Sequence, residues 1–309
     1  MSPATTAPFG RVLTAMVTPF DTAGALDTDA AAALAAHLVD HRHDGLVISG
    51  TTGESPATTD DEQERLLQAV VESVGDRACV VAGVGSNDTA HAVALAQQAA
   101  RAGADAVLAV TPYYSKPPQE GILAHFTAIA DATGLPVMLY DIPGRTGVKL
   151  SADTLARSAE HPRIVAVKEA SGDLAAGSWL LRSTDLAVYS GDDALNLAWL
   201  ALGAVGVVSV VGHVAGERYA DMVTAVEAGD LAAARGIDRS LLPALAAIMT
   251  RTQGAIMAKA AMQLTGALPN RHVRPPLVDA TDAQVAELWR DLITAELVEP
   301  GSTEEDIAL

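Results

Sequence analysis

Cysteine is almost absent from this chain, and aromatic residues are few. The 309 residues include a single cysteine, Cys79, and aromatic side chains make up 4% of the composition. One cysteine excludes a disulfide within the chain, and its place in the apolar run Cys79–Ala82 is typical of a small core side chain. Hydrophobic residues account for 50%, enough to bury the core of one large domain with an extension. The composition suits a folded protein in a reducing compartment.

Basic residues are also scarce. Lysine and arginine number 20 against 38 acidic residues, which gives a formal net charge of −18. Such a surface repels phosphate backbones and anionic lipid, so we expect no nucleic acid and no membrane as partner. No run reaches the roughly 18 apolar residues of a membrane span, and the N-terminus carries no basic segment before a long apolar stretch. We therefore expect a soluble, cytoplasmic protein.

Sequence signatures of bound nucleotides and metals are missing as well. The Gly-x-Gly at Gly83–Gly85 lacks the third glycine of a dinucleotide fingerprint, and Gly50–Ser55 lacks the Gly-Lys-Ser/Thr ending of a P-loop. The histidines show no spacing typical of a zinc site; they are His37, His41, His43, His91, His125, His161, His213 and His272. We therefore expect neither a metal nor a separate cofactor.

Short apolar runs alternate with alanine-rich segments up to about residue 229. Parallel strands joined by helices produce this alternation. Eight strands are predicted, at Val12–Val17, Gly45–Ser49, Cys79–Val84, Ala106–Val110, Val137–Tyr140, Ile164–Lys168, Leu186–Ser190 and Gly206–Val210. Helices between them, often entered at Asp, Ser or Thr residues suited to N-capping, are predicted at Asp29–Asp40, Asp60–Val74, Thr89–Ala102 and Gln119–Ala132.

Eight strand and helix repeats predict an α/β fold of the closed (β/α)8 TIM barrel type. A doubly wound open sheet is the alternative, but it usually has fewer strands and carries the glycine fingerprint. Beyond about residue 230 the pattern is helical only, with helices expected at Leu231–Thr250, Ala255–Leu264 and Asp282–Leu297. We predict a catalytic barrel over 1–229 and a C-terminal helical domain over 230–309, with Pro300–Leu309 as a disordered, solvated end.

Lys168 follows the apolar run Ile164–Val167, where a charged side chain is unexpected. Such a run indicates a strand buried on both faces. Burial disfavours the charged ammonium and lowers the pKa of a lysine, and a neutral amine can form a Schiff base with a carbonyl substrate. Two ordinary interpretations stay open at this point: a surface lysine just past the strand end, or a lysine paired with the adjacent Glu169.

Neighbouring strand ends carry further polar side chains. In a barrel, catalytic residues gather at the C-terminal ends of the strands. Tyr140 ends the strand before the lysine strand and can exchange a proton with a carbinolamine, and Arg145 in the turn beyond it suits a carboxylate. Thr51 and Thr52 lie in a turn of small residues that can admit a small anion. Glu54 is expected to satisfy backbone donors of that turn. Taken singly, a packed tyrosine and an arginine bound to carbonyl groups remain alternatives.

Five segments resemble, in order, the signatures of the 4-hydroxy-tetrahydrodipicolinate synthase (dihydrodipicolinate synthase) family of the N-acetylneuraminate lyase superfamily. They are Gly50–Ser55, Val110–Tyr114, Tyr140–Gly147, Val167–Ala170 and Ser190–Asp193. The resemblance covers nearly the whole chain and is greatest to actinobacterial members, at Tyr113–Pro118 and Tyr140–Arg145. It implies a lyase of lysine and diaminopimelate biosynthesis with a TIM barrel fold.

The resemblance implies a class I aldolase reaction without any other cofactor. Pyruvate would form a Schiff base on Lys168, tautomerise to an enamine, and condense with L-aspartate 4-semialdehyde to give 4-hydroxy-tetrahydrodipicolinate. Tyr140, Thr51 and Tyr114 would relay protons, with Tyr114 reaching into the site of the neighbouring subunit across a tight dimer interface. This relay requires at least a dimer.

Substrate-binding roles follow from the same resemblance. Thr51 and Thr52 would hold the pyruvate carboxylate, and Arg145 would receive the carboxylate of the semialdehyde. Gly191 and Val208 would line the pocket. Family members are commonly homotetramers built from two tight dimers, so we expect a homotetramer here.

Two other functions fit the same fold. N-acetylneuraminate lyases and 2-keto-3-deoxy-sugar-acid aldolases keep the strand-end lysine and tyrosine, but usually carry a less basic residue where Arg145 stands. A non-catalytic barrel that senses pyruvate or an amino acid would predict damage among the relay residues. Lys168, Tyr140, Thr51 and Tyr114 are all present, which favours the enzyme.

One departure from the family concerns feedback inhibition by L-lysine. Inhibited members resemble this chain at Ser55, Asn87 and Tyr113, but usually carry histidine or tryptophan where Asp60 stands and glutamate where His91 stands. A histidine cannot supply the carboxylate that would bind a lysine ammonium. We expect L-lysine to inhibit weakly or not at all, and strong inhibition at low-millimolar L-lysine in a standard activity assay would contradict this hypothesis.

Overall fold

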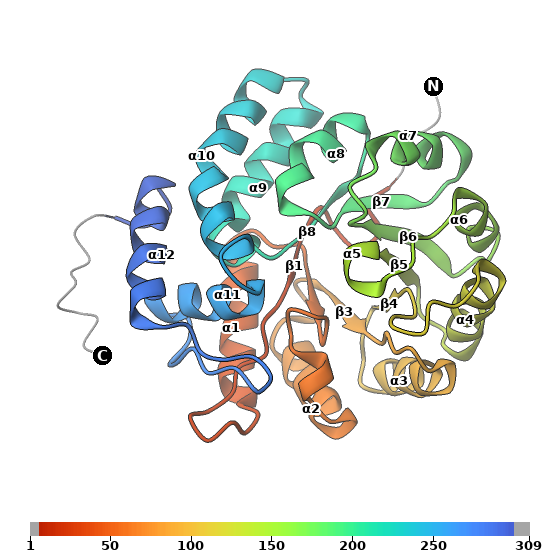
Figure 1. The fold of residues 1–309 in the computed structure, drawn as a ribbon, viewed down its shortest axis with the longest axis horizontal. Coiled ribbons are helices and arrows are strands. Elements are labelled where there is room, and N and C mark those ends of the chain that lie inside the picture. The colour runs from red at the N-terminus through yellow and green to blue at the C-terminus, as the bar shows by residue number, and fades with distance from the viewer. Residues whose placement is uncertain (1–5, 300–309) are drawn as a thin grey trace.

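Eight parallel strands form a closed barrel in chain order (Figure 1). The structure, a computed structural model, describes residues 6–299, so the expected tail Pro300–Leu309 lies outside the described residues. The strands are β1 Val12–Ala15, β2 Gly45–Ile48, β3 Cys79–Gly83, β4 Ala106–Val110, β5 Val137–Asp141, β6 Ile164–Glu169, β7 Ala187–Ser190 and β8 Gly206–Ser209. Because β1 pairs in parallel with β8, the prediction of a TIM barrel is confirmed and the open sheet is excluded.

Most helices surround the barrel on its outer side, whereas the short α5 lies over the ends of the strands (Figure 1). They are α1 Thr28–Asp40, α2 Asp60–Val74, α3 Thr89–Arg101, α4 Gln119–Ala132, α5 Pro143–Thr146, α6 Ala152–Ser158, α7 Leu174–Ser183, α8 Asn196–Leu202 and α9 Gly212–Glu227, with short 3-10 turns η1 Ser55–Ala57 and η2 Asp193–Leu195. N-caps define several starts: Asp27 caps α1, and Thr59 forms a capping box with Glu62 at α2. Such caps satisfy the free N–H groups of the first turn.

Side chains of the strands alternate between two cores. One cluster fills the barrel interior and includes Met138, Tyr140, Ala166 and Val208. A larger cluster lies between the strands and the helices and includes Val137, Leu139 and Val167. Successive strand residues point to opposite faces, so the parity that sends Ala166 inward sends residue 168 inward as well. The fold therefore directs Lys168 into the barrel.

Three further helices follow the barrel toward the C-terminus of the chain: α10 Leu231–Met249, α11 Gly254–Leu264 and α12 Asp282–Thr294. The predicted C-terminal helical extension is confirmed. The last helix, α12, ends at Thr294, three residues before the predicted end at Leu297, and Glu296 just beyond it has a left-handed φ of +58°. Both α10 and α11 pack against α9, and the division at residue 229 stays a prediction. Within residues 6–299 no single helix is long and apolar enough to cross a membrane; α10 and α11 pass that test only as a pair, bent by 112°.

Candidate active site

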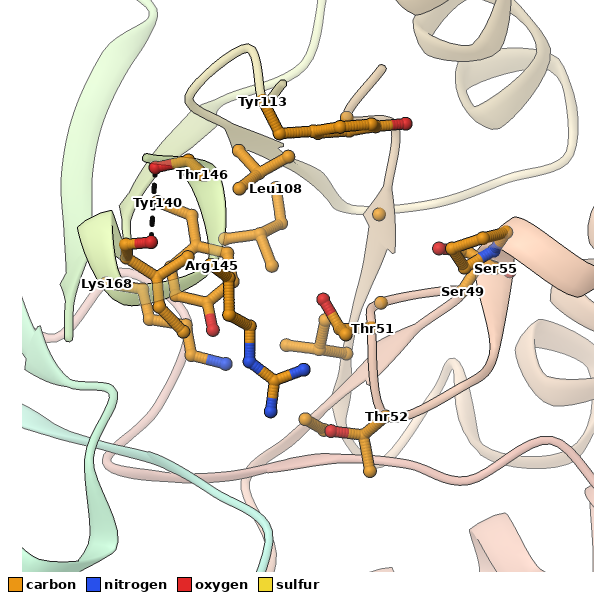
Figure 2. Close-up of a pocket in the computed structure, with 18 of the residues that line it drawn as sticks. Ser49, Thr51, Thr52, Ser55, Leu108, Tyr113, Tyr140, Arg145, Thr146 and Lys168 are labelled. Carbon is orange, nitrogen blue, oxygen red and sulfur yellow. Dashed lines mark hydrogen bonds between the residues drawn. The ribbon is translucent and has the colours of Figure 1, made fainter. Parts of the chain in front are cut away.

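A cavity of about 640 Å³ opens at the C-terminal ends of the strands. Strand ends and the loops after them line it, as is usual for the active site of a barrel enzyme. Side chains from β5, β6 and the loop after β2 point into the same space in Figure 2. The lining residues include Thr51, Thr52, Tyr113, Tyr114, Tyr140, Arg145 and Lys168. Six of the eight predicted site residues therefore meet in one cavity.

Lys168 lies inside the barrel mouth with only 4% of its surface exposed. It pairs in register with Tyr140 on β5, and its Nζ lies 4.4 Å from the centre of the Tyr140 ring. Glu169 points to the opposite face of the strand, where its carboxylate accepts hydrogen bonds from Ser171. Both ordinary interpretations of the lysine, at the surface or paired with Glu169, are wrong.

Burial changes the proton affinity of both groups. It lowers the pKa of Lys168 to about 8, an effect that Asp193 opposes and Arg145 reinforces. It raises the pKa of Tyr140 to about 12, which Arg145 partly offsets. At neutral pH roughly a tenth of the amine is therefore neutral, while the phenol keeps its proton. A nucleophile and a proton donor lie side by side.

Arg145 is presented by a single helical turn, α5, directly after β5. Pro143 occupies the first position, where its fixed φ suits a helix start, and the turn ends at Gly147 with a φ of +77°. The guanidinium extends toward the amine of Lys168 and toward the loop that carries Thr52 (Figure 2). A fixed positive charge at this place suits an anionic ligand.

The two threonines follow β2 in a tightly bonded loop. The N–H of Glu54 donates to the carbonyl of Thr51 (3.1 Å), and the hydroxyl of Thr18 donates to the carbonyl of Gly53 (2.6 Å). Glu54 itself does not bind backbone donors of its own turn, contrary to expectation. Its carboxylate accepts from the backbone N–H of Arg274 (2.8 Å), far along the chain.

Tyr114 lies at the rim of the cavity and is 89% exposed. Its backbone φ of +70° is in the left-handed region, which costs energy for a residue with a bulky side chain. Within residues 6–299 no hydrogen bond joins the hydroxyls of Tyr114, Thr51 and Tyr140. The relay among these three hydroxyls therefore stays a prediction.

The two remaining predicted residues, Gly191 and Val208, lie next to residues that line the cavity. A Cβ on Gly191 would come within 2.8 Å of Lys168 Cγ and 3.0 Å of the Glu169 carbonyl oxygen, so this position leaves room for the lysine side chain. Val208 is buried in the barrel interior, in the same cluster as Tyr140. Both pack against residues of the site, and their role in lining the pocket stays a prediction.

Sequence reasoning assigned no role to Asp193, which the structure places behind Lys168. Its buried carboxylate accepts hydrogen bonds from the side chains of Ser209 and Asn196 and from the N–H groups of Val210 (2.9 Å) and Val211 (3.0 Å). It thus ties the loop after β7 to the loop after β8. In the sequence, the one signal that Asp193 links these loops was the pair Asp192-Asp193 just after a strand end.

Two departures from inhibited family members meet in space. His91 Nε2 lies 3.0 Å from an oxygen of Asp60, so the two side chains neutralise each other when the imidazole is protonated.

Across the described part of the chain, no group of three or more His, Cys, Asp or Glu side chains is arranged to hold a metal ion.

A parallel barrel with a buried lysine, a tyrosine and an arginine at its mouth defines the class of aldolase-type barrel enzymes. Within that class, the chain belongs to the dihydrodipicolinate synthetase family, whose model matches residues 8–295. It is 63% identical to the 4-hydroxy-tetrahydrodipicolinate synthase of Kineococcus radiotolerans, over 94% of each chain. It is also 63% identical to the enzyme of the same name from Acidothermus cellulolyticus, over 95% of this chain and 94% of the other.

A solved structure gives the same result for the fold. The crystal structure of the synthase from Cyanidioschyzon merolae with lysine bound superposes with a TM-score of 0.91 at 43% identity. The match covers 95% of this chain and 100% of that chain. The barrel and its C-terminal helices are therefore those of the family.

The lowered pKa of Lys168 can be tested without any substrate. Reductive methylation by formaldehyde requires a neutral amine, so its rate at Lys168 should rise about tenfold between pH 7 and pH 9 and then level off. Peptide mass spectrometry measures the rate, with Lys149, exposed and paired with Asp173, as a reference in the same digest. Arg145→Met should move the midpoint to higher pH, because it removes a positive charge. A rate at Lys168 that still climbs steeply above pH 10 would contradict the assignment.

Proposed function

We propose that this barrel condenses pyruvate with L-aspartate 4-semialdehyde through a Schiff base on Lys168, giving 4-hydroxy-tetrahydrodipicolinate. The overall reaction, a lyase step of diaminopimelate and lysine biosynthesis, follows from membership of the family. Enzymes of this family need no external cofactor. The observation that carries the mechanism is the buried amine of Lys168 beside Tyr140.

The chemistry begins with attack of the neutral amine on the ketone carbon of pyruvate. The resulting carbinolamine loses its hydroxyl as water, with Tyr140 supplying a proton, and leaves an iminium on Lys168. Loss of a methyl proton converts the iminium to an enamine, because the positive nitrogen accepts the electron pair. The enamine carbon attacks the aldehyde carbon of the semialdehyde, whose oxygen takes a proton to become a hydroxyl. The amino group of the semialdehyde then attacks the imine carbon, closes the ring and releases the lysine.

Two anchors orient the substrates in this proposal. Thr51 and Thr52 hold the pyruvate carboxylate with hydroxyl and backbone donors, and Arg145 binds the carboxylate of the semialdehyde. Arg145 also lowers the pKa of Lys168, so the same charge that binds an acid keeps the amine reactive. Fixed geometry of this kind lowers the entropic cost of bringing two reactants together.

Assembly completes the site in the same proposal. Tyr114 projects from the rim, where it can enter a neighbouring subunit's cavity and hand protons to Thr51 and Tyr140. A second interface joins two such dimers into a homotetramer, and the exposed Trp179 of α7 and Leu202 of α8 (66% and 40% exposed) offer apolar surface for it. We assign the enzyme to the cytoplasm, where pyruvate is available and the lone Cys79 stays reduced.

Borohydride trapping tests the mechanism directly. Reduction in the presence of pyruvate should place a stable adduct on Lys168 and on none of the other lysines, Lys116, Lys149 and Lys259. Intact-mass and peptide mass spectrometry locate the adduct, and Lys168→Ala should give none. An adduct elsewhere, or no adduct on the wild-type enzyme, would overturn the Schiff-base mechanism. Rates with aspartate semialdehyde and with N-acetylmannosamine then separate the synthase from a sugar-acid lyase, since Arg145 favours the acidic aldehyde.

The contribution of Tyr114 across the interface can be tested by mixing variants. Tyr114→Phe should lower kcat by about 10²-fold if its hydroxyl relays protons. Mixed with Lys168→Ala under subunit exchange, it should recover about a quarter of wild-type activity, because half the dimers are hybrids with one intact site each. The matched control mixes Lys168→Ala with Tyr140→Phe, which share a subunit's site and should recover nothing. No recovery in the first mixture would show that Tyr114 acts within its own chain or not at all.

A further inference from the structure

A second buried lysine lies outside the cavity, at the junction of barrel and extension. Lys259 of α11 and Glu54 of the threonine loop have side chains only 1% and 2% exposed, with Nζ and Oε1 2.5 Å apart. The same Nζ donates to the carbonyl of His272 (2.7 Å). Taking two charges out of water is costly, and a buried pair is tolerated only when its geometry is good. This pair joins segments about two hundred residues apart in sequence.

The other oxygen of Glu54 is held as well. Its Oε2 accepts from the backbone N–H of Arg274 at 2.8 Å. The guanidinium of Arg274 in turn pairs with Glu62 of α2 and donates to the carbonyls of Gly24 and Ala57, each at 2.8 Å. Both carboxylate oxygens of Glu54 are thus fixed by the C-terminal part of the chain.

An aromatic ring completes the enclosure. Phe20, in the loop after β1, lies 4.2 Å from Lys259 Nζ and 4.2 Å from the Arg274 guanidinium carbon. Cations over the face of an aromatic ring are attracted to it, more strongly where water is excluded. The two positive groups are therefore fixed relative to the barrel as well as to Glu54.

Glu54 is linked directly to the residues that face the cavity. It follows Thr51, Thr52 and Gly53 without a break, and its φ of +54° puts it in the left-handed region. Its N–H donates to the Thr51 carbonyl at 3.1 Å. A non-glycine residue keeps this backbone conformation only when its surroundings hold it there. A shift of the Glu54 carboxylate would therefore move the two threonines.

We propose that Lys259 and Glu54 are positioning residues that fix Thr51 and Thr52 for the pyruvate carboxylate, so the C-terminal extension sets the affinity for pyruvate. The inference rests on the proposed function, in which the threonine pair binds that carboxylate. Neither residue touches substrate. Their effect therefore falls mainly on binding of pyruvate, with a smaller effect on kcat because Thr51 also belongs to the proposed proton relay.

The test uses the full-length enzyme with Lys259→Met, Glu54→Gln and Glu54→Asp. Lys259→Met removes the cation, and Glu54→Asp keeps the charge but draws it back by one methylene. Each should raise the KM for pyruvate, and the pyruvate concentration for half-maximal borohydride trapping, by about tenfold, with the KM for the semialdehyde within about twofold of wild type and kcat lowered by less than about threefold. Lys149→Met, which removes an exposed lysine paired with Asp173, is the control and should change none of these.

Thermal unfolding identifies variants that fail to fold. If Lys259→Met does not fold, the KM of Glu54→Asp for pyruvate tests the inference, because that variant retains both the carboxylate and the ammonium of the buried pair. Folded variants with the wild-type KM for pyruvate would overturn the inference, as would equal rises in both KM values with a fall in kcat, which would indicate general loosening. A wild-type enzyme that traps no pyruvate would overturn the proposed function and this inference together.

Discussion

The rest of the site depends on one constraint, the burial of a lysine amine inside the mouth of a closed barrel. The alternation of strand side chains sends Tyr140 and Lys168 inward at paired positions, while Glu169 faces outward and bonds to Ser171. Had the register of β6 slipped by one residue, the carboxylate would have entered the barrel in place of the amine. Barrel closure therefore determines which group faces the cavity and, through burial, how readily that group gives up its proton.

Periodicity in the sequence was enough to predict the barrel, because strands buried on both faces appear as continuous apolar runs. All eight strands were placed within about two residues, and the apolar run before Lys168 correctly indicated a buried amine. The tie between Glu54 and Lys259 could not be predicted in this way, since no local pattern links residues that meet only after the extension folds back. The same limit applied to Asp193, whose partners Ser209, Val210 and Val211 belong to the next strand and loop.

The two buried lysines show how much the surroundings decide what an amine does. Burial lowers the pKa of each to about 8. The amine of Lys259 contacts the carboxylate of Glu54, the carbonyl of His272 and the ring of Phe20. Lys168 lies against an open cavity with no carboxylate in direct contact in the described residues. The first is suited to hold structure, and the second is free to react.

The order of the strands also bears on when the enzyme becomes competent during its synthesis. A ribosome delivers the chain from its N-terminus, and the barrel closes only when β8 pairs with β1. Before β7 and the loop after it are made, the β6 amine has neither β7 beside it nor Asp193 behind it, and the threonine loop lacks its contact with Lys259 until α11 is made. A truncated product that ends before α11 would thus display the reactive side chains without the environment that makes them effective, so incomplete chains should carry little premature chemistry.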